Sequence, residues 1–505
     1  MILHLSHELP RHATPRHDTM EVPVVVKHGA NRHKLEIALE GEDAAENFKL
    51  QLYSLTGVEP SRQKIMVKGG VLKDGADMTK LGVKENHTFM MMGTAGELLK
   101  EPVEKHKFLE DMSDEQQAQV TKYPSGLVNL GNTCYMNSTL QTLRAIPELR
   151  DGLLEYSAPA APANSLLAAQ GPSLTTALRD LYQSMSNTTR EYTPLAFLTV
   201  LRNQFPQFAE RGRDGMYKQQ DAEECWSQIM QTLKMSLGGR KDTDDAAFVD
   251  QYLLGQFATT MTCDDSPDEP AVESTETFIK LDCHISIKTN FMRDGLLAAL
   301  EEKIEKQSAV LGRQATFTKS SRISRLPKYL TVHFVRFFWR RDVNKKTKIM
   351  RKVGFPFEFD ATELCTDSLR KMTIPVRDKL RDLKKEQGER ERAAKRAKSN
   401  DDTSPEINAP DVSAELEKVM NPEVAKDKSC NKSGLYGLKA IITHGGASAE
   451  GGHYRAWVKE EEKKDTWWKF NDEQVSQVTQ DRIETLAGGG ESDSAFVLLY
   501  SAVSY

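Results

Sequence analysis

The chain has 505 residues, which suggests about three domains, or one large domain with a small one. Hydrophobic residues make up 39% and charged residues 28%, a polar balance that predicts a charged insert within otherwise globular sequence. The 68 Lys and Arg residues stand against 73 Asp and Glu residues, and the net charge of −5 excludes a generally basic nucleic-acid-binding protein. We therefore expect no nucleic-acid partner.

The six cysteines are too few for a disulfide-stapled scaffold, and no two of them form a CxxC pair. A reducing compartment is the default for such a chain, and zinc ribbons lose their main signature. No apolar run reaches the roughly 18 residues of a transmembrane helix, so we expect no membrane partner. We expect neither a metal nor another cofactor.

The first 95 residues divide into an extension and a small domain. Residues 1–20 have no apolar signal core and are predicted to be a disordered extension. Hydrophobic alternation, then helical spacing, then further alternation predict a small α/β unit of order ββαββ at 21–95. The predicted elements are strands at 24–26 and 34–39, a helix at 44–55, and strands at 65–67 and 88–92.

This unit resembles ubiquitin-like domains in the run Pro60–Ile65, in the following run Lys68–Asp74, and in its last strand. The resemblance implies a β-grasp fold. The chain continues past Gly93 without a Gly-Gly tail, which indicates a built-in module and not a conjugated modifier. By position, the resemblance places Met66 and Met91 in an exposed apolar patch that binds a partner, since exposed Met adapts to partner surfaces. The alternative is that both side chains pack inside the domain.

The rest of the chain is predicted to be a linker and one interrupted domain. Residues 96–122 are charged and form a linker with some helical potential. Residues 123–505 are globular apart from a charged insert at 377–428, predicted to be partly helical and partly disordered. The run Lys395–Lys398 is either a nuclear address or part of a solvated helix.

The strongest chemical signal is the run Gly126–Ser138. Cys134 precedes a helical pattern, and a helix N-terminus favours a thiolate. Asn129 and Asn132 stand in a Gly-containing loop and can direct side-chain amides toward the sulfur, as an oxyanion hole requires. The pattern indicates a cysteine nucleophile.

A thiol nucleophile needs a base that is distant in sequence. His453 is the best candidate because glycines precede it and a strand pattern follows it. A second strand pattern ends at Asn471 and Asp472, so in a hairpin Asn471 would lie beside His453 and hold its tautomer. Asp472 is the alternative for that position.

Residues 125–138 and 451–472 resemble the Cys box and the His box of the ubiquitin-specific proteases, papain-like cysteine proteases that cleave after the C-terminal Gly-Gly of ubiquitin. The resemblance implies an α+β fold with fingers, palm and thumb over residues 123–505, and no structural zinc. The roles that it implies are nucleophile for Cys134, base for His453, third triad member for Asn471 and oxyanion-hole donor for Asn129.

A further run, Lys218–Glu224, resembles the segment of this family that grips the ubiquitin tail. The resemblance implies substrate contacts for Gln219 and Asp221, and the alternative for Asp221 is a helix cap. Substrate contacts are also expected at Gly452 and Tyr454, which flank the predicted base.

A ubiquitin-like module ahead of such a catalytic domain resembles the proteasome-associated deubiquitinases. The resemblance implies hydrolysis of isopeptide bonds in ubiquitin conjugates, docking to the 26S regulatory particle through the module, and a location in cytoplasm and nucleus. It also implies that loops near 339–348 and 445–452 block the groove until docking. The alternatives are a ubiquitin-binding adaptor without activity, which a degenerate Cys or His box would favour, and a general papain-like protease.

Overall fold

The computed structural model describes residues 21–41, 43–94, 109–158, 173–238, 247–340, 345–397, 412–448, 451–463 and 465–503. The chain divides into two compact units, Met1–Phe108 and Leu109–Tyr505, which we describe separately. The predicted extension at 1–20 lies outside the described residues, as do residue 95 and residues 96–108 of the predicted linker. In the described part of the chain, no helix is long and apolar enough to cross a membrane.

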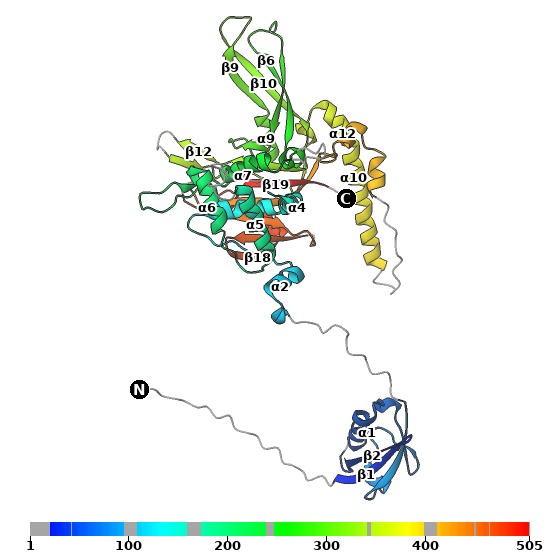
Figure 1. The fold of residues 1–505 in the computed structure, drawn as a ribbon. Coiled ribbons are helices and arrows are strands. Elements are labelled where there is room, and N and C mark those ends of the chain that lie inside the picture. Colours follow the sequence, from blue (N-terminus) through cyan, green and yellow to red (C-terminus); the bar gives the residue numbers. More distant parts are fainter. Residues whose placement is uncertain are drawn as a thin grey trace, which may run out of the picture. The chain divides into compact units, whose positions relative to one another are not determined.

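The first unit is a five-stranded sheet with one helix (Figure 1). The sheet order is β2-β1-β5-β3-β4, and the central strands β1 and β5 are parallel. This is the β-grasp arrangement that the sequence predicted. The elements are β1 (Glu21–His28), β2 (Asn31–Ala38), α1 (Ala44–Thr56), β3 (Lys64–Val67), β4 (Gly70–Val71) and β5 (His87–Met92).

The last strand corrects one predicted site residue of this unit. Side chains alternate between the two faces of a strand, so Phe89 and Met91 point into the core while Met90 and Met92 point outward. Met91 is only 1% exposed and packs in the hydrophobic core, so its prediction as a partner-binding residue is wrong. Met66 is 42% exposed and pairs with Met90 across the strands. The methionine patch is therefore Met66, Met90 and Met92.

The second unit is a large sheet with one group of helices packed on one face and residues of later helices in a second core on the other, which confirms the predicted α+β class (Figure 1). The helices share a core with the inner residues of strands β15, β16 and β19. The first α-helices of the unit are α2 (Asp114–Thr121), α3 (Cys134–Arg144), α4 (Pro147–Glu155), α5 (Leu174–Ser186), α6 (Leu195–Gln204), α7 (Ala222–Ser236) and α8 (Phe248–Tyr252). Later in the chain come α9 (Met292–Ala299) and α13 (Gln480–Glu484).

The large sheet forms the palm of the unit, with the order β18-β17-β16-β15-β19-β11-β8 and a short strand β14 paired with β15. Its antiparallel hairpin β16–β17 was predicted from the alternation around His453. The strands are β8 (Lys280–His284), β11 (Tyr329–Val335), β14 (Glu358–Asp360), β15 (Leu435–Gly445), β16 (His453–Lys459), β17 (Thr466–Asn471), β18 (Gln474–Thr479) and β19 (Ser494–Ala502).

A second sheet extends away from the palm as a long finger-like projection (Figure 1). It contains β6 (Gly255–Cys263), β7 (Val272–Phe278), β9 (Glu301–Gln307) and β10 (Gln314–Arg325). A separate hairpin joins β12 (Phe337–Arg340) to β13 (Lys345–Lys348). Among the described residues, no cluster of His, Cys, Asp and Glu side chains could hold a metal ion. Short 3-10 helices lie at Pro60–Arg62, Met78–Leu81, Leu109–Asp111, Pro206–Ala209, Thr362–Leu364 and Thr485–Ala487.

The predicted boundary of the charged insert is wrong. Helix α10 spans Asp367–Ala397, so it begins ten residues before the predicted start of the insert at 377. Val376, Leu380 and Leu383 are buried, because apolar residues at helical spacing continue into the charged run and anchor the helix. The part of the insert at 398–411 lies outside the described residues, and α11 (Val412–Glu417) and α12 (Pro422–Lys426) follow.

Candidate active site

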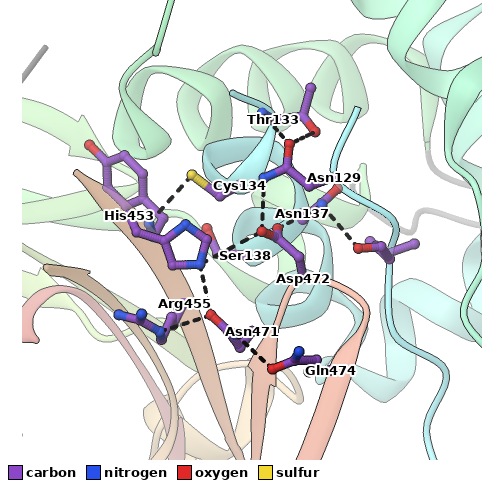
Figure 2. A network of polar contacts seen from close by, with 12 residues as sticks. Asn129, Thr133, Cys134, Asn137, Ser138, His453, Arg455, Asn471, Asp472 and Gln474 are labelled. Carbon is purple, nitrogen blue, oxygen red and sulfur yellow. Dashed lines mark hydrogen bonds and ion pairs between the residues drawn. The ribbon is translucent and has the colours of Figure 1, made fainter. Parts of the chain in front are cut away.

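Cys134 begins helix α3, as the sequence predicted, and its side chain is almost fully buried. The preceding turn places Gly131 and Asn132 at φ 92° and φ 53°, and the Thr133 hydroxyl accepts the Leu130 N–H at 2.9 Å. Two groups donate to the sulfur: Nε2 of Gln219 at 3.2 Å and the backbone N–H of Tyr454 at 3.5 Å. The nucleophile candidate therefore lies where α3, the Gln219 loop and strand β16 meet (Figure 2).

Burial opposes the thiolate that the helix position favours. Burial is the largest influence and raises the pKa of the Cys134 thiol, although the two N–H donors act in the opposite direction. Burial also raises the pKa of Cys430 to about 11 and the pKa of both Cys283 and Cys365 to about 12. Burial therefore favours the protonated thiol of Cys134 in this arrangement.

His453 is the first residue of β16 and lies beside the end of β17. Its Nε2 is 2.7 Å from Oδ1 of Asn471 and 3.6 Å from Oδ2 of Asp472. An amide oxygen only accepts hydrogen bonds, so Nε2 carries the ring proton and Nδ1 keeps a lone pair. The predicted juxtaposition of His453 and Asn471 is confirmed, and Figure 2 shows the imidazole between Asn471 and Cys134.

Asp472 joins the Cys box to the His box. Its carboxylate accepts one hydrogen bond from Nδ2 of Asn129 and another from Nδ2 of Asn137, each at 2.8 Å. Its backbone oxygen accepts from Leu127 N at 3.0 Å. A Cβ at Gly126 would overlap the backbone of Glu473, so only glycine allows this close approach. The two sequence motifs therefore form one rigid hydrogen-bonded site.

The amides expected to face the sulfur point elsewhere. Asn129 donates to Asp472, and its Oδ1 accepts from the backbone N–H of Gly131 at 2.9 Å. Asn132 donates to the backbone oxygen of Tyr217 at 2.9 Å. The expectation that these two side chains point at Cys134 is wrong for this arrangement because backbone and carboxylate partners hold them. Gln219 is the amide that reaches the sulfur.

Of the four predicted substrate residues, two lie at the start of α7 and two flank His453 at the start of β16. Gln219 and Asp221 lie at the N-terminal end of α7, and Asp221 caps that helix by accepting Glu223 N at 3.0 Å. The ring of Tyr454 is only 1% exposed and packs in the core, so the prediction that Tyr454 contacts the substrate is wrong for the ring. Its backbone N–H points at Cys134. Gly452 has φ 153°, and a Cβ there would overlap the His444 ring.

Lysines of the β12–β13 hairpin reach the site. Nζ of Lys346 lies 3.0 Å from Oδ2 of Asp221. Lys348 is buried and donates to the backbone oxygens of His444 at 2.7 Å and Gly446 at 3.0 Å. Burial lowers the pKa of Lys348 to about 8. The hairpin is thus fixed to the strand that enters the 445–452 loop, and it neutralises a predicted tail-binding residue.

Sequence reasoning missed three residues of the polar network: Asn137, Arg455 and Gln474. Asn137 follows Cys134 by three residues on α3, and Arg455 follows His453 by two residues on β16. Those spacings put each of them on the same face as its catalytic candidate, which is a signal that the sequence already carried. Arg455 donates to Oδ1 of Asn471 at 2.9 Å, and Nδ2 of Asn471 donates to Oε1 of Gln474 at 3.2 Å.

A buried thiol at a helix start, with an imidazole oriented by an amide on the neighbouring strand, defines the class of cysteine hydrolases. The family model described as "Ubiquitin carboxyl-terminal hydrolase" matches residues 125–500, and the model "Ubiquitin family" matches residues 24–96. The chain belongs to the ubiquitin carboxyl-terminal hydrolase family and carries a ubiquitin-like domain. It is a cysteine-type deubiquitinase, and ubiquitin is its substrate.

Relatives match over nearly the whole chain. "Ubiquitin carboxyl-terminal hydrolase 6" of Schizosaccharomyces pombe is 44% identical over 490 residues, covering 96% of this chain and 99% of its own length. "Ubiquitin carboxyl-terminal hydrolase 14" of Caenorhabditis elegans is 34% identical over 467 residues, with 90% and 88% covered. A solved structure titled for the SAGA Ubp8 deubiquitinase module bound to ubiquitin aldehyde has a TM-score of 0.50 at 19% identity, covering 75% of this chain and 70% of that chain, and supports the fold.

Proposed function

We propose that this chain is a proteasome-docked deubiquitinase in which Cys134 is the nucleophile, His453 is the general base and acid, and Asn471 orients the imidazole. The single observation that carries the assignment is the 2.7 Å contact between Nε2 of His453 and Oδ1 of Asn471. This contact leaves Nδ1 unprotonated on the side of the ring that faces the thiol. Asp472 lies 3.6 Å from the same nitrogen and assists electrostatically.

The reaction follows from these positions. Nδ1 of His453 takes the thiol proton as the sulfur attacks the carbonyl carbon of the terminal glycine of ubiquitin. The tetrahedral oxyanion is stabilised by backbone N–H groups and by Asn129 once its amide leaves Asp472. Collapse transfers the proton from His453 to the departing lysine amine and leaves a thioester. A water molecule deprotonated by His453 then hydrolyses the thioester and regenerates the thiol.

A fluorogenic amide of the ubiquitin C-terminus tests this assignment. Wild type releases the fluorophore, Cys134→Ala abolishes release, and His453→Ala lowers kcat by about 10²–10⁴-fold because the proton-transfer group is lost. The matched control is Cys430→Ala, which removes a thiol outside the site. Full turnover by the Cys134→Ala chain would contradict the mechanism. Ubiquitin binding without turnover by wild type would instead favour the adaptor alternative.

Contacts within the chain support the autoinhibition that the family resemblance implies. Lys346 pairs with Asp221, the residue for which we propose a contact with a basic side chain of the ubiquitin tail. Thr347 forms an isolated β-bridge with Ser448. Lys348 donates hydrogen bonds to the backbone oxygens of His444 and Gly446, so the hairpin is bonded to the 445–452 loop. We infer that the tail must displace Lys346, which makes the enzyme autoinhibited until docking moves these loops.

Lys346→Ala tests this inhibition. An ion pair of this exposure contributes about 1 kcal/mol or less, so its loss should raise the basal kcat/KM on the ubiquitin amide by up to about fivefold. The increase should be smaller at high salt, since salt already screens the wild-type pair. Lys426→Ala, which breaks an ion pair on α12, is the control and should leave the rate unchanged. An unchanged or lower rate for Lys346→Ala would rule out this ion pair as the inhibitory contact.

The methionine patch supports a docking role for the ubiquitin-like domain. Met66, Met90 and Met92 are 42%, 53% and 51% exposed on one region of the sheet, and flexible thioether side chains suit a protein partner. We propose that this surface binds the regulatory particle of the 26S proteasome, which brings the hydrolase to ubiquitin conjugates. A location in cytoplasm and nucleus would follow from that partner.

Pull-down of purified 26S proteasomes tests the docking surface. The double variant Met66→Asp/Met90→Asp should reduce bound proteasome by at least about tenfold, because charge is placed in an apolar contact. Leu50→Asp changes an equally exposed apolar residue on α1 and should bind as wild type does. Equal loss in both variants, or in neither of them, would contradict the assignment to the methionine patch.

A further inference from the structure

Arg455 contacts the amide that orients the proposed base. Its Nε donates to Oδ1 of Asn471 at 2.9 Å, and its Nη1 lies 2.6 Å from Oδ1 of Asp493. Arg455 is two residues after His453 on β16, so both side chains share one face of the strand and converge on the same oxygen (Figure 2). The side chains of Arg455 and Asp493 are only 26% and 9% exposed, which keeps both groups in place.

An asparagine at the third position of a catalytic triad has an orientation problem that an aspartate does not have. Its side chain has one accepting end and one donating end of nearly the same shape. Only the oxygen end can accept the Nε2 proton of His453 and so leave a lone pair on Nδ1. The reversed amide would favour the opposite tautomer, with the proton on Nδ1 facing Cys134, and the base would be lost.

Arg455 selects the productive orientation because a guanidinium only donates hydrogen bonds. It bonds favourably to the oxygen end of Asn471 and would repel the NH₂ end. Gln474 supports the same choice, since its Oε1 accepts from Nδ2 of Asn471 at 3.2 Å. Asp493 fixes the guanidinium and balances its charge, so the imidazolium that forms during the reaction does not meet an uncompensated cation.

We propose that Arg455 is a positioning residue that locks the Asn471 amide with its oxygen toward His453 and thereby sets the tautomer of the base. The inference rests on the proposed catalytic roles of these residues. With an asparagine at position 471, the orientation of the base depends on the donor at position 455. With a carboxylate at position 471 it would not, because both oxygens accept.

A double-mutant cycle tests the lock. Arg455→Met removes the donors while keeping an apolar chain, and in the wild-type background it should lower kcat on the ubiquitin amide by about tenfold or more, with KM changed by less than about twofold. In an Asn471→Asp background, where both oxygens accept, the same change should cost less than about threefold. Any effect of leaving Asp493 unpaired is common to both backgrounds and cancels in the cycle.

Two further variants separate positioning from folding. Arg455→Lys also offers only N–H donors and should recover most of the kcat that Arg455→Met loses. Asp493→Asn weakens the ion pair but leaves the bond from Arg455 to Asn471, so it should lower kcat less than Arg455→Met does. Thermal melting of every variant shows whether the fold is kept.

An equal loss of kcat from Arg455→Met in both backgrounds, or no loss in the wild-type background, would overturn the proposal that Arg455 orients Asn471. An inactive Asn471→Asp chain would also overturn it, since any hydrogen-bond acceptor at position 471 should hold His453. The proposal is equally overturned if Arg455→Lys fails to recover kcat although its melting temperature matches that of the wild type. A wild-type chain without hydrolase activity would instead refute the proposed function. The two failures are therefore distinguishable.

Discussion

The site depends on the carboxylate of Asp472. This side chain is buried, sits at φ 54° just after strand β17, and accepts amide hydrogen bonds from Asn129 and Asn137 at 2.8 Å. A buried carboxylate needs such donors, because an unpaired charge in a protein interior is strongly destabilising. The hydrogen bond from Asn137 holds the end of β17 against the start of α3, although the two segments are more than 300 residues apart in sequence. That contact brings His453 and Asn471 to Cys134.

The same preference for satisfied polar groups underlies the autoinhibition that we propose. The amides of Asn129 and Gln219 both have partners other than a substrate: Asn129 donates to Asp472, and Gln219 donates to the sulfur itself. Burial keeps the pKa of the thiol raised, and Lys346 occupies the Asp221 carboxylate. In the activation that we propose, substrate binding exchanges these contacts for equivalent ones, so few hydrogen bonds are lost overall.

Local patterns predicted the local structure well. Helical spacing after Cys134 and alternation around His453 gave α3, β16 and β17, and the family resemblance joined them. The wrong predictions concern residues whose burial depends on three-dimensional packing. Met91 differs from its exposed neighbours only by strand phase, and charge density at 377 hid the buried face of α10. The direction of the Asn129 side chain depends on a distant partner that no local pattern encodes, whereas strand alternation already put Arg455 on the face of His453 and Tyr454 on the other.

We propose that Cys134 is the thiol that this network activates toward the ubiquitin C-terminus. A ubiquitin probe with a C-terminal vinyl sulfone reports this directly, because it alkylates the nucleophile and peptide mass spectrometry locates the adduct. We expect a single thioether on Cys134 at high probe concentration, and no adduct in the Cys134→Ala chain. An adduct on another cysteine, or labelling that persists in Cys134→Ala, would contradict it.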